Sequence, residues 1–231
     1  MARSTTRPPI PFSAREFVFV DPSVADLGVL LKGMRPQIAV SVLSGAEPTS
    51  GQMARVLAQH QGIDVLHIVA HGQPGEVSFA AGALSLESVD DHREDLGRIG
   101  SALSADGEIR LWVCEAAAGD NGAAFIAALM RNTGVPVAAS AGRVGAAAHG
   151  GNWTLDARSG GPVLPPLTPE GIAAYAGVLA TFNATTGVDD LDGGIGQDTF
   201  IVTATNQIQA ADRFDGGSGI DTVLVLSLIH I

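Results

Sequence analysis

The 231-residue chain has little cysteine, few aromatic residues and few charges. Its single cysteine, Cys114, excludes an intramolecular disulfide and any metal site built from several thiolates. Only 16% of the residues are charged, and the net charge of −11 argues against nucleic acid or an anionic membrane surface as a partner. No apolar run reaches the roughly 18 residues that a membrane span needs. What remains is a globular protein, for which 46% of apolar residues supplies ample core material.

The two ends of the chain differ from its middle. Residues 1–14 are rich in Pro, Arg and Thr and are predicted to form a disordered arm. This arm lacks the apolar stretch of a cleavable signal peptide. At the other end, LVLSLIHI stops without a cap or a polar tail, so we expect the native pattern to continue beyond residue 231.

Between the ends, strand-like apolar runs alternate with amphipathic helical stretches. The predicted strands are 16–20, 38–43, 63–70, 109–114 and 135–140, with a late edge strand at 153–157. The predicted helices cover 24–34, the stretch from a cap at Thr49 or Ser50 to Gly62, 90–103, 121–132 with Asn121 as its cap, and 169–180. A hairpin is predicted from 76–79 and 83–86. The order βαβαβ at the start predicts an α/β domain, residues 15–180, with a parallel sheet flanked by helices.

Two of the predicted strands end in side chains that can perform chemistry. IDVLHIVAHG ends in His71 and Gly72, and EIRLWVC ends in Cys114. Open α/β folds bind ligands at the carboxyl ends of their strands. A thiolate nucleophile needs a base and nearby backbone donors, which a histidine and a strand-to-helix turn can supply. The alternative is that Cys114 is an inert core residue and His71 a structural turn residue. His67, within the strand, is expected to be buried between layers.

The stretch from Glu16 to Asp156 resembles a bacterial domain of unknown function in the caspase-like cysteine peptidase superfamily. That domain commonly opens large surface proteins of the RTX or adhesin type. The matching signatures, in order, are FVFVDPSV, DVLHIVAHGQPGEVSF, GALSLES, ALSADGEIRLWVCEAAAG and AAAHGGNWTLD. The resemblance implies a caspase-like sheet, with His71 as general base or acid and Cys114 as nucleophile. It also implies an oxyanion hole formed by the backbone N–H groups of Gly72 and Cys114.

One position departs from the pattern of this family. Glu115 follows the cysteine where the family usually has Asn. A carboxylate beside the sulfur raises the pKa of the thiol and disfavours the thiolate. A catalytically inactive caspase-like module, serving in anchoring, presentation or adhesion, is therefore the alternative to a cysteine peptidase that cuts a peptide substrate or its own chain.

The tail, residues 181–231, carries two copies of a glycine-rich nonapeptide. GGIGQDTFI at 193–201 and GGSGIDTVL at 216–224 both fit the pattern G-G-x-G-x-D-x-U-x, where U is apolar, of RTX calcium-binding repeats. The tail also holds seven Asp and no Glu against one Arg. Ca²⁺ takes six to eight oxygen ligands, so successive loops must share each ion. The pattern thus predicts a short parallel β-roll that binds calcium; a flexible Gly/Asp-rich linker is the alternative.

The spacing of the repeats places the predicted site. Weaker copies at 184–192 and 207–215 precede the two complete ones, and the complete loops lie 23 residues apart. We therefore expect a calcium ion between the 193–198 and 216–221 loops, with a bulge at 203–206. The predicted ligands and loop residues are Asp198 and Asp221 first, Asp192 and Asp215 second, and the glycines Gly193, Gly194, Gly196, Gly216, Gly217 and Gly219.

Together these patterns predict the N-terminal region of a secreted or surface bacterial protein. The resemblance implies export by a one-step machinery that reads a C-terminal signal, and folding of the tail in extracellular calcium. The expected partners are calcium ions and a peptide substrate or the chain itself.

Overall fold

A computed structural model describes residues 15–155 and 163–179 of the α/β domain. In the tail it describes residues 182–183, 188, 190–192, 199–202, 207–216 and 221–225. The predicted arm, residues 1–14, lies outside the described residues.

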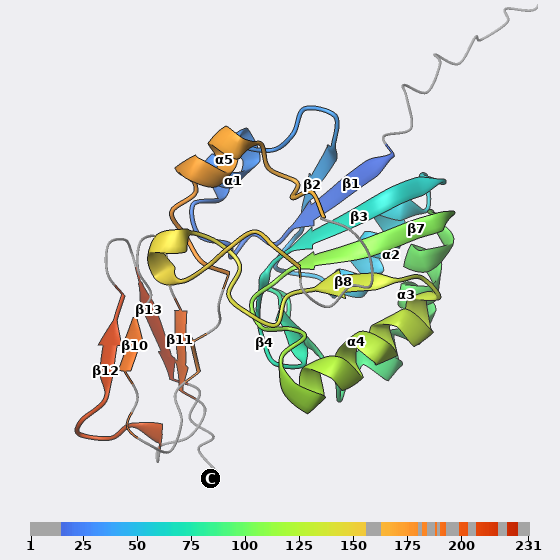
Figure 1. Ribbon diagram of the computed structural model, residues 1–231. Coiled ribbons are helices and arrows are strands. Elements are labelled where there is room, and N and C mark those ends of the chain that lie inside the picture. Colours follow the sequence, from blue (N-terminus) through green and yellow to red (C-terminus); the bar gives the residue numbers. More distant parts are fainter. Residues whose placement is uncertain are drawn as a thin grey trace, which may run out of the picture.

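A five-stranded parallel sheet forms the centre of the domain (Figure 1). Its strands stand in the order β2-β1-β3-β7-β8, and every neighbouring pair is parallel. The bounds are β1 Glu16–Val20, β2 Ala39–Val42, β3 Ile63–Val69, β7 Leu103–Trp112 and β8 Val137–Ala139. The central strands β1, β3 and β7 are rich in apolar residues on both sides because a parallel sheet is covered on both faces. The predicted α/β fold with a mainly parallel sheet is confirmed.

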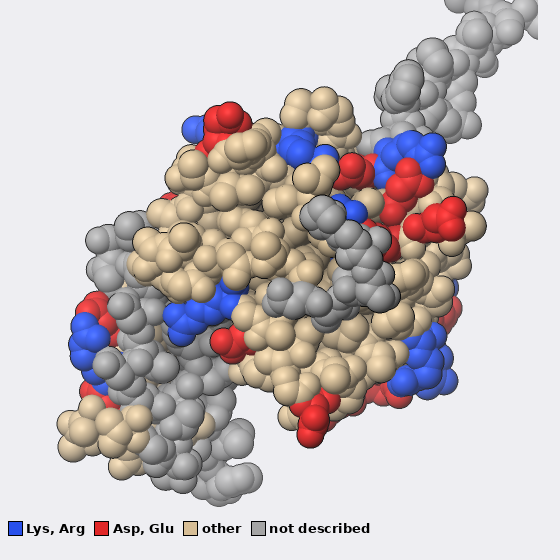
Figure 2. Space-filling model, viewed as in Figure 1, with Lys and Arg blue, Asp and Glu red and all other residues tan. Residues whose placement is uncertain are grey.

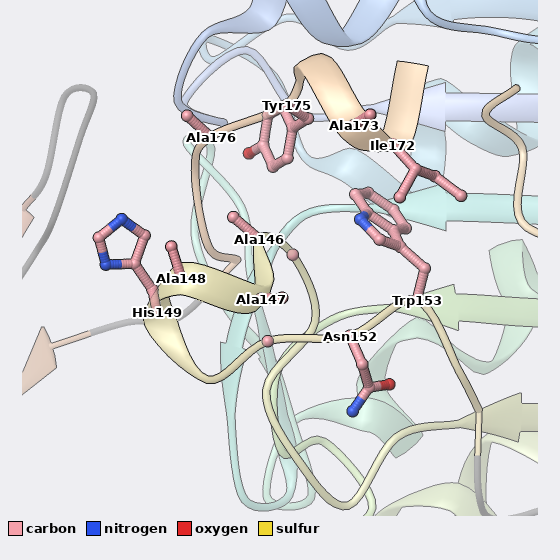
Figure 3. A pocket seen from close by; sticks show the side chains of 12 residues that line it. Ala146, Ala147, Ala148, His149, Asn152, Trp153, Ile172, Ala173, Tyr175 and Ala176 are labelled. Carbon is pink, nitrogen blue, oxygen red and sulfur yellow. The ribbon is translucent and has the colours of Figure 1, made fainter. Parts of the chain in front are cut away.

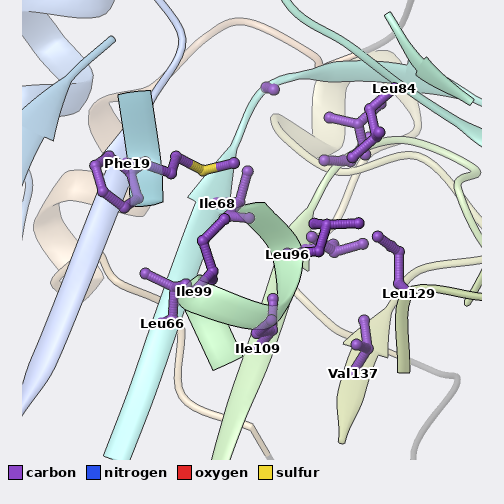
Figure 4. Close-up of a cluster of buried hydrophobic side chains, with 14 of the residues drawn as sticks. Phe19, Leu66, Ile68, Leu84, Leu96, Ile99, Ile109, Leu129 and Val137 are labelled. Atoms are coloured by element: carbon purple, nitrogen blue, oxygen red, sulfur yellow. The ribbon is translucent and has the colours of Figure 1, made fainter. Parts of the chain in front are cut away.

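Helices cover both faces of this sheet (Figure 1). The helices are α1 Leu27–Lys32, α2 Thr49–Leu57, α3 Arg93–Ser101, α4 Gly119–Thr133 and α5 Pro169–Ala174, with 3-10 turns η1 Val89–His92 and η2 Ala147–His149. One core cluster joins the sheet to α2, α3 and α4, and Figure 4 shows part of it, including Leu66, Ile99 and Leu129. A second cluster on the opposite face joins the sheet to α1 and to the segment after α5. Each fully buried Leu or Ile contributes about 1.5–3 kcal/mol.

Helix ends follow the sequence signals at some positions. Thr168 caps α5, because its Oγ1 accepts a hydrogen bond from the Gly171 N–H at 3.0 Å, and Pro169 occupies the first turn. Gly134 ends α4 in a left-handed conformation, with φ of 75°.

The predicted caps at Thr49 or Ser50 and at Asn121 are wrong. Helix α2 begins at Thr49 after Pro48, and the Ser50 hydroxyl lies 2.9 Å from His92 Nδ1 instead of capping the helix. Helix α4 begins at Gly119, so Asn121 lies inside its first turn.

The excursion between β3 and β7 is larger than the predicted hairpin. Three short antiparallel strands form a small sheet, β4 His71–Gln73, β5 Glu76–Ser78 and β6 Leu84–Ser85. His71 therefore belongs to the first strand of this sheet. The predicted helix over 90–103 ends at Ser101 because Leu103 pairs with Ile63 and starts β7.

The late edge strand predicted at 153–157 is absent over its described part, residues 153–155. Asn152 Oδ1 accepts a hydrogen bond from the Thr154 N–H at 2.9 Å. Such local side-chain bonds compete with strand pairing. Helix α5 likewise ends at Ala174, short of the predicted residue 180, because Tyr175 is extended and Val178 forms an antiparallel bridge with Gly145.

The tail contains two small parallel sheets. One has the order β13-β11-β9 and the other pairs β10 with β12. The bounds are β9 Phe182–Asn183, β10 Asp190–Asp192, β11 Thr199–Val202, β12 Arg213–Asp215 and β13 Thr222–Val225. Phe200 of β11 is buried and belongs to the second core cluster, so the tail packs against the α/β domain.

Glycines in α3 allow a test of the packing between α3 and α4. A Cβ on Gly100 would stand 2.8 Å from the carbonyl carbon of Thr133, whereas a Cβ on Gly97 would meet nothing nearer than 3.8 Å. We expect Gly100→Ala to lower the free energy of unfolding in urea by about 1–3 kcal/mol. Gly97→Ala, the matched control, should raise it by up to about 1 kcal/mol, because alanine favours helix. Shifts of the same sign in both variants would contradict this packing.

Candidate functional site

The strands that lead to His71 and Cys114 are neighbours in the sheet. Strand β3 pairs in parallel with β7, with Val69 opposite Trp112. Two residues beyond this last pair, the chain reaches His71 on one side and Cys114 on the other. The structure therefore brings the two strand ends to the same edge of the sheet, as the sequence predicts.

Gly72 makes this approach possible. A Cβ at position 72 would stand 2.7 Å from the Glu76 carbonyl oxygen and 3.3 Å from the Cys114 carbonyl oxygen, and it would also collide with Val113. Only glycine leaves room for β4 to lie directly against the chain that carries the cysteine. The His-Gly pair thus has a packing reason that is independent of any catalytic role.

The thiol of Cys114 is closed off from solvent. Cys114 is 0% exposed and belongs to the second core cluster. Its Sγ accepts a hydrogen bond from the Val144 N–H at 3.1 Å and donates to the Val144 carbonyl at 3.4 Å. Burial raises the pKa of Cys114 to about 12, and the Glu115 carboxylate adds to the rise. In this conformation the group is a protonated thiol.

The backbone donors beside the sulfur are also engaged. The Cys114 N–H, predicted to help form an oxyanion hole, donates to the Leu179 carbonyl at 3.3 Å. The Glu115 N–H donates to Gly142, and the Ala117 N–H donates to Ser140. Leu179 in turn donates its N–H to Val144 at 2.9 Å, so residues 144 and 179 together cover the thiol. Nucleophilic attack at Cys114 requires this cover to open.

His71 is half-buried and has a different partner. Its Nε2 lies 3.1 Å from the Ser23 carbonyl oxygen, which can only accept, so Nε2 carries a proton. Ser23 is held by the buried carboxylate of Asp21, which accepts from the Ser23 N–H at 2.9 Å and from the Ala80 N–H at 3.0 Å. Asp21 thus ties the end of β1 to the segment after β5 and orients the partner of His71. The sequence patterns give no signal for this role of Asp21.

A buried polar chain lies behind the site, on the same face of the sheet as Cys114. His67 is fully buried, as predicted, and its Nδ1 accepts a hydrogen bond from Trp112 Nε1 at 2.9 Å. Because an indole N–H can only donate, the His67 proton resides on Nε2, which lies 3.2 Å from Glu16. Burial lowers the pKa of His67, so the ring is neutral. The hydrogen bond from His67, with the Arg35 guanidinium beside it, lowers the pKa of Glu16 to about 2.

The predicted calcium site lies only partly within the described residues. Asp215, Gly216 and Asp221 are described, together with the backbone of Asp192. Asp215 pairs with Arg213, and the Asp221 side chain packs against Gly216, where a Cβ would collide with it. The predicted Gly193, Gly194, Gly196, Asp198, Gly217 and Gly219 lie outside the described residues, as does the bulge at 203–206. Within the described residues alone, no group of three or more His, Cys, Asp or Glu is placed to hold a metal ion.

The domain is thus an α/β unit with a closed thiol at the edge of its parallel sheet. Residues 17–179 match the family model described as Domain of unknown function (DUF4347). The match covers more than half of the chain, which therefore belongs to this family. No curated protein and no solved structure matches the chain. Among the helices of the described residues, none is long and apolar enough to cross a membrane.

The closed thiol can be tested by alkylation, which reports on one residue because Cys114 is the only cysteine. We expect iodoacetamide at pH 7.5 to label the native chain about a thousandfold more slowly than the unfolded chain. This factor follows from a pKa raised from 9.0 to about 12, since the thiolate is the reacting species. His71→Ala should leave the native rate unchanged. Rapid native labelling that His71→Ala slows would instead show an accessible, base-paired thiol.

Proposed function

We propose that this chain is the N-terminal region of a secreted or surface calcium-binding protein, in which the α/β domain leads into an RTX-type parallel β-roll. The observation that supports this most is the strand register of the tail. Strand β10 pairs with β12 and β11 with β13, each at an offset of 23 residues, such as Asp190 with Arg213 and Thr199 with Thr222. This offset equals the spacing between the two glycine-rich nonapeptides.

The register suggests how the two loops come together. The 193–198 loop follows β10 and precedes β11, and the 216–221 loop follows β12 and precedes β13. Both pairs of flanking strands are parallel and aligned, and our proposal is that the two loops stack in the same register. A calcium ion between them would take backbone carbonyls and carboxylates from both turns. The successive strands also alternate between two sheets, as a roll requires.

The described residues at the second loop fit this arrangement. Gly216 provides the space in which the Asp221 side chain folds back over the turn. Asp221 is therefore the ligand that we place first among the described residues. Asp215, whose carboxylate pairs with Arg213, is the second choice.

Calorimetry of the full chain with millimolar calcium tests this proposal. We expect saturable heat of binding, and Asp221→Asn should weaken the affinity on the order of tenfold by removing a charged oxygen ligand. Asp106→Asn, the same change at an exposed position of the α/β domain, is the matched control and should bind as the parent does. Absence of binding heat in the parent chain, or equal loss in both variants, would overturn the calcium assignment.

A second candidate function concerns the α/β domain. The neighbouring ends of β3 and β7, with Gly72 packed against Val113 and Cys114, favour a caspase-like cysteine peptidase that uses His71 and Cys114. The burial of the thiol and the engaged Cys114 N–H favour the other role, an inactive module that anchors or presents the rest of a surface protein. In the closed conformation the second role fits better.

Self-processing separates the two roles. The full chain is incubated at neutral pH with and without millimolar calcium, and its fragments are followed by mass spectrometry. A peptidase yields a defined cleavage that both Cys114→Ala and His71→Ala abolish, whereas Ser140→Ala, nearby but outside the pair, retains it. An intact chain under both conditions, with Cys114 still resistant to alkylation, identifies the inactive module.

A further inference from the structure

A cavity of about 470 Å³ opens on the same side of the sheet as Cys114. One wall is the glycine- and alanine-rich loop from Gly145 to Trp153, and the other is the segment Ile172–Ala176 (Figure 3). Its volume lies within the range of small-molecule sites. This is the AAAHGGNW stretch of the sequence, for which neither proposed function gives a role.

Close backbone contacts build the glycine- and alanine-rich wall. A Cβ on Gly151 would stand 2.8 Å from the Gly145 carbonyl carbon and 3.0 Å from the Ala146 carbonyl oxygen. Gly145 has φ of 135°, a conformation that side chains disfavour. The loop therefore folds back on itself and presents the small side chains of Ala146, Ala147 and Ala148 to the cavity (Figure 3).

The lining selects for a neutral ligand. None of the described lining residues carries a carboxylate, an ammonium or a guanidinium group. His149 lies at the mouth, and its backbone carbonyl accepts a hydrogen bond from Arg143 at 3.4 Å. Figure 2 shows a mostly uncharged surface over this part of the molecule, with charged side chains towards its margins. A phosphate or another strongly charged ligand would find no counter-charge in this lining.

Trp153 supplies a hydrogen-bond donor to the wall of the cavity. Trp153 is only 8% exposed, and within the described part of the chain its Nε1 has no hydrogen-bond partner. The ring is held in place by Trp112 and Tyr175, each with its centroid 5.8 Å away. In Figure 3 the indole nitrogen lies on the edge of the ring that faces Ala146 and Ala147 across the cavity.

The other tryptophan shows what such a donor ordinarily does. Trp112 is also buried, and its Nε1 donates to His67 at 2.9 Å. A buried donor without a partner is costly, and native proteins keep few of them without a reason. A ligand with an acceptor in the cavity would satisfy Trp153 in the way that His67 satisfies Trp112.

We propose that this cavity binds a neutral ligand consisting of an aromatic or branched apolar group next to a carbonyl, whose oxygen accepts a hydrogen bond from Trp153 Nε1. The apolar group occupies the space bordered by the alanines and Ile172. Two sources carry this chemistry, a small free carbonyl compound and an apolar residue of a peptide.

The two indole N–H signals in a nitrogen-15 NMR spectrum of the full chain test the proposal directly. Acetophenone and ethylbenzene serve as probes of closely similar shape, of which only acetophenone has an acceptor. We expect acetophenone to move the Trp153 signal downfield and leave the Trp112 signal in place, because the Trp112 N–H is already bonded to His67. Trp153→Phe assigns the signal by removing it. This variant should also lower the affinity for acetophenone by about fivefold, while leaving the affinity for ethylbenzene unchanged.

A second variant tests the location of the ligand. Ala173→Leu, at an exposed position on the cavity wall, should abolish binding of both probes and leave the Trp112 signal and the fold unchanged. N-acetyl-phenylalaninamide and the tripeptide N-acetyl-Ala-Phe-Ala-amide then distinguish the sources. A tripeptide that binds tighter than acetophenone identifies a peptide ligand, and the reverse order identifies a free carbonyl compound.

The proposal fails if acetophenone at its solubility limit leaves the Trp153 signal unmoved. It fails equally if ethylbenzene produces the same downfield shift, or if Ala173→Leu binds acetophenone as the parent does. Neither calcium binding nor thiol reactivity affects these outcomes. The experiments therefore test the ligand of this cavity independently of the proposed function.

Discussion

The parallel pairing of β3 with β7 in the middle of the sheet is the constraint on which the rest of the structure depends. Both strands carry apolar residues on both sides, so each face of the sheet must be covered. Helices α2, α3 and α4 cover one face. In the described part of the chain, the other face is covered by the short helices α1 and α5, by irregular chain and by Phe200 of the tail. That irregular chain contains Val144 and Leu179, which close over Cys114, and Trp153 and Tyr175, which line the cavity. The burial of the thiol and the formation of the cavity thus both result from covering this face of the sheet with irregular chain.

The sequence is sufficient to predict the sheet, because continuous apolar runs and glycine-ended helices are local signals. It also predicts that His71 and Cys114 reach the same edge, since consecutive parallel strands end together. It does not predict the partners of these residues. The Val144 and Leu179 backbones reach Cys114 from 30 or more residues away, and a backbone hydrogen bond leaves no trace in side-chain identity. The strand prediction at 153–157 is wrong for a related reason. Aromatic and β-branched residues such as Trp153 and Thr154 favour a strand, but the Asn152 side chain accepts a hydrogen bond from the Thr154 N–H and holds the chain in a turn.

The tail and the α/β domain share a core around Phe200 and Phe214. Phe200 occupies the apolar position of the first nonapeptide and is buried in the same cluster as Trp112 and Cys114. It also contacts Phe214 edge-on, at a centroid distance of 5.8 Å. The segment that covers the thiol runs to Leu179, three residues before β9 begins. Phe200 thus joins the tail to the same core cluster that contains Cys114.

The Trp112–His67–Glu16 chain gives the domain a defined response to acid. Burial lowers the folded pKa of His67 below the 6.5 of an unfolded histidine. Double protonation of the ring would also remove the acceptor of the indole hydrogen bond. The unfolded chain then binds more protons than the folded one, and stability falls as the pH drops below about 6.5. Glu16, with a pKa of about 2 against 4.5 when unfolded, adds a second loss between those values. On the alkaline side, the pKa of Cys114 is about 12 in the folded chain and 9.0 in the unfolded chain. Stability therefore falls as the pH rises between these two values. The contribution of these three groups to stability is constant from near neutrality to about pH 9. In acid it decreases in two steps, the first from His67 and the second from Glu16.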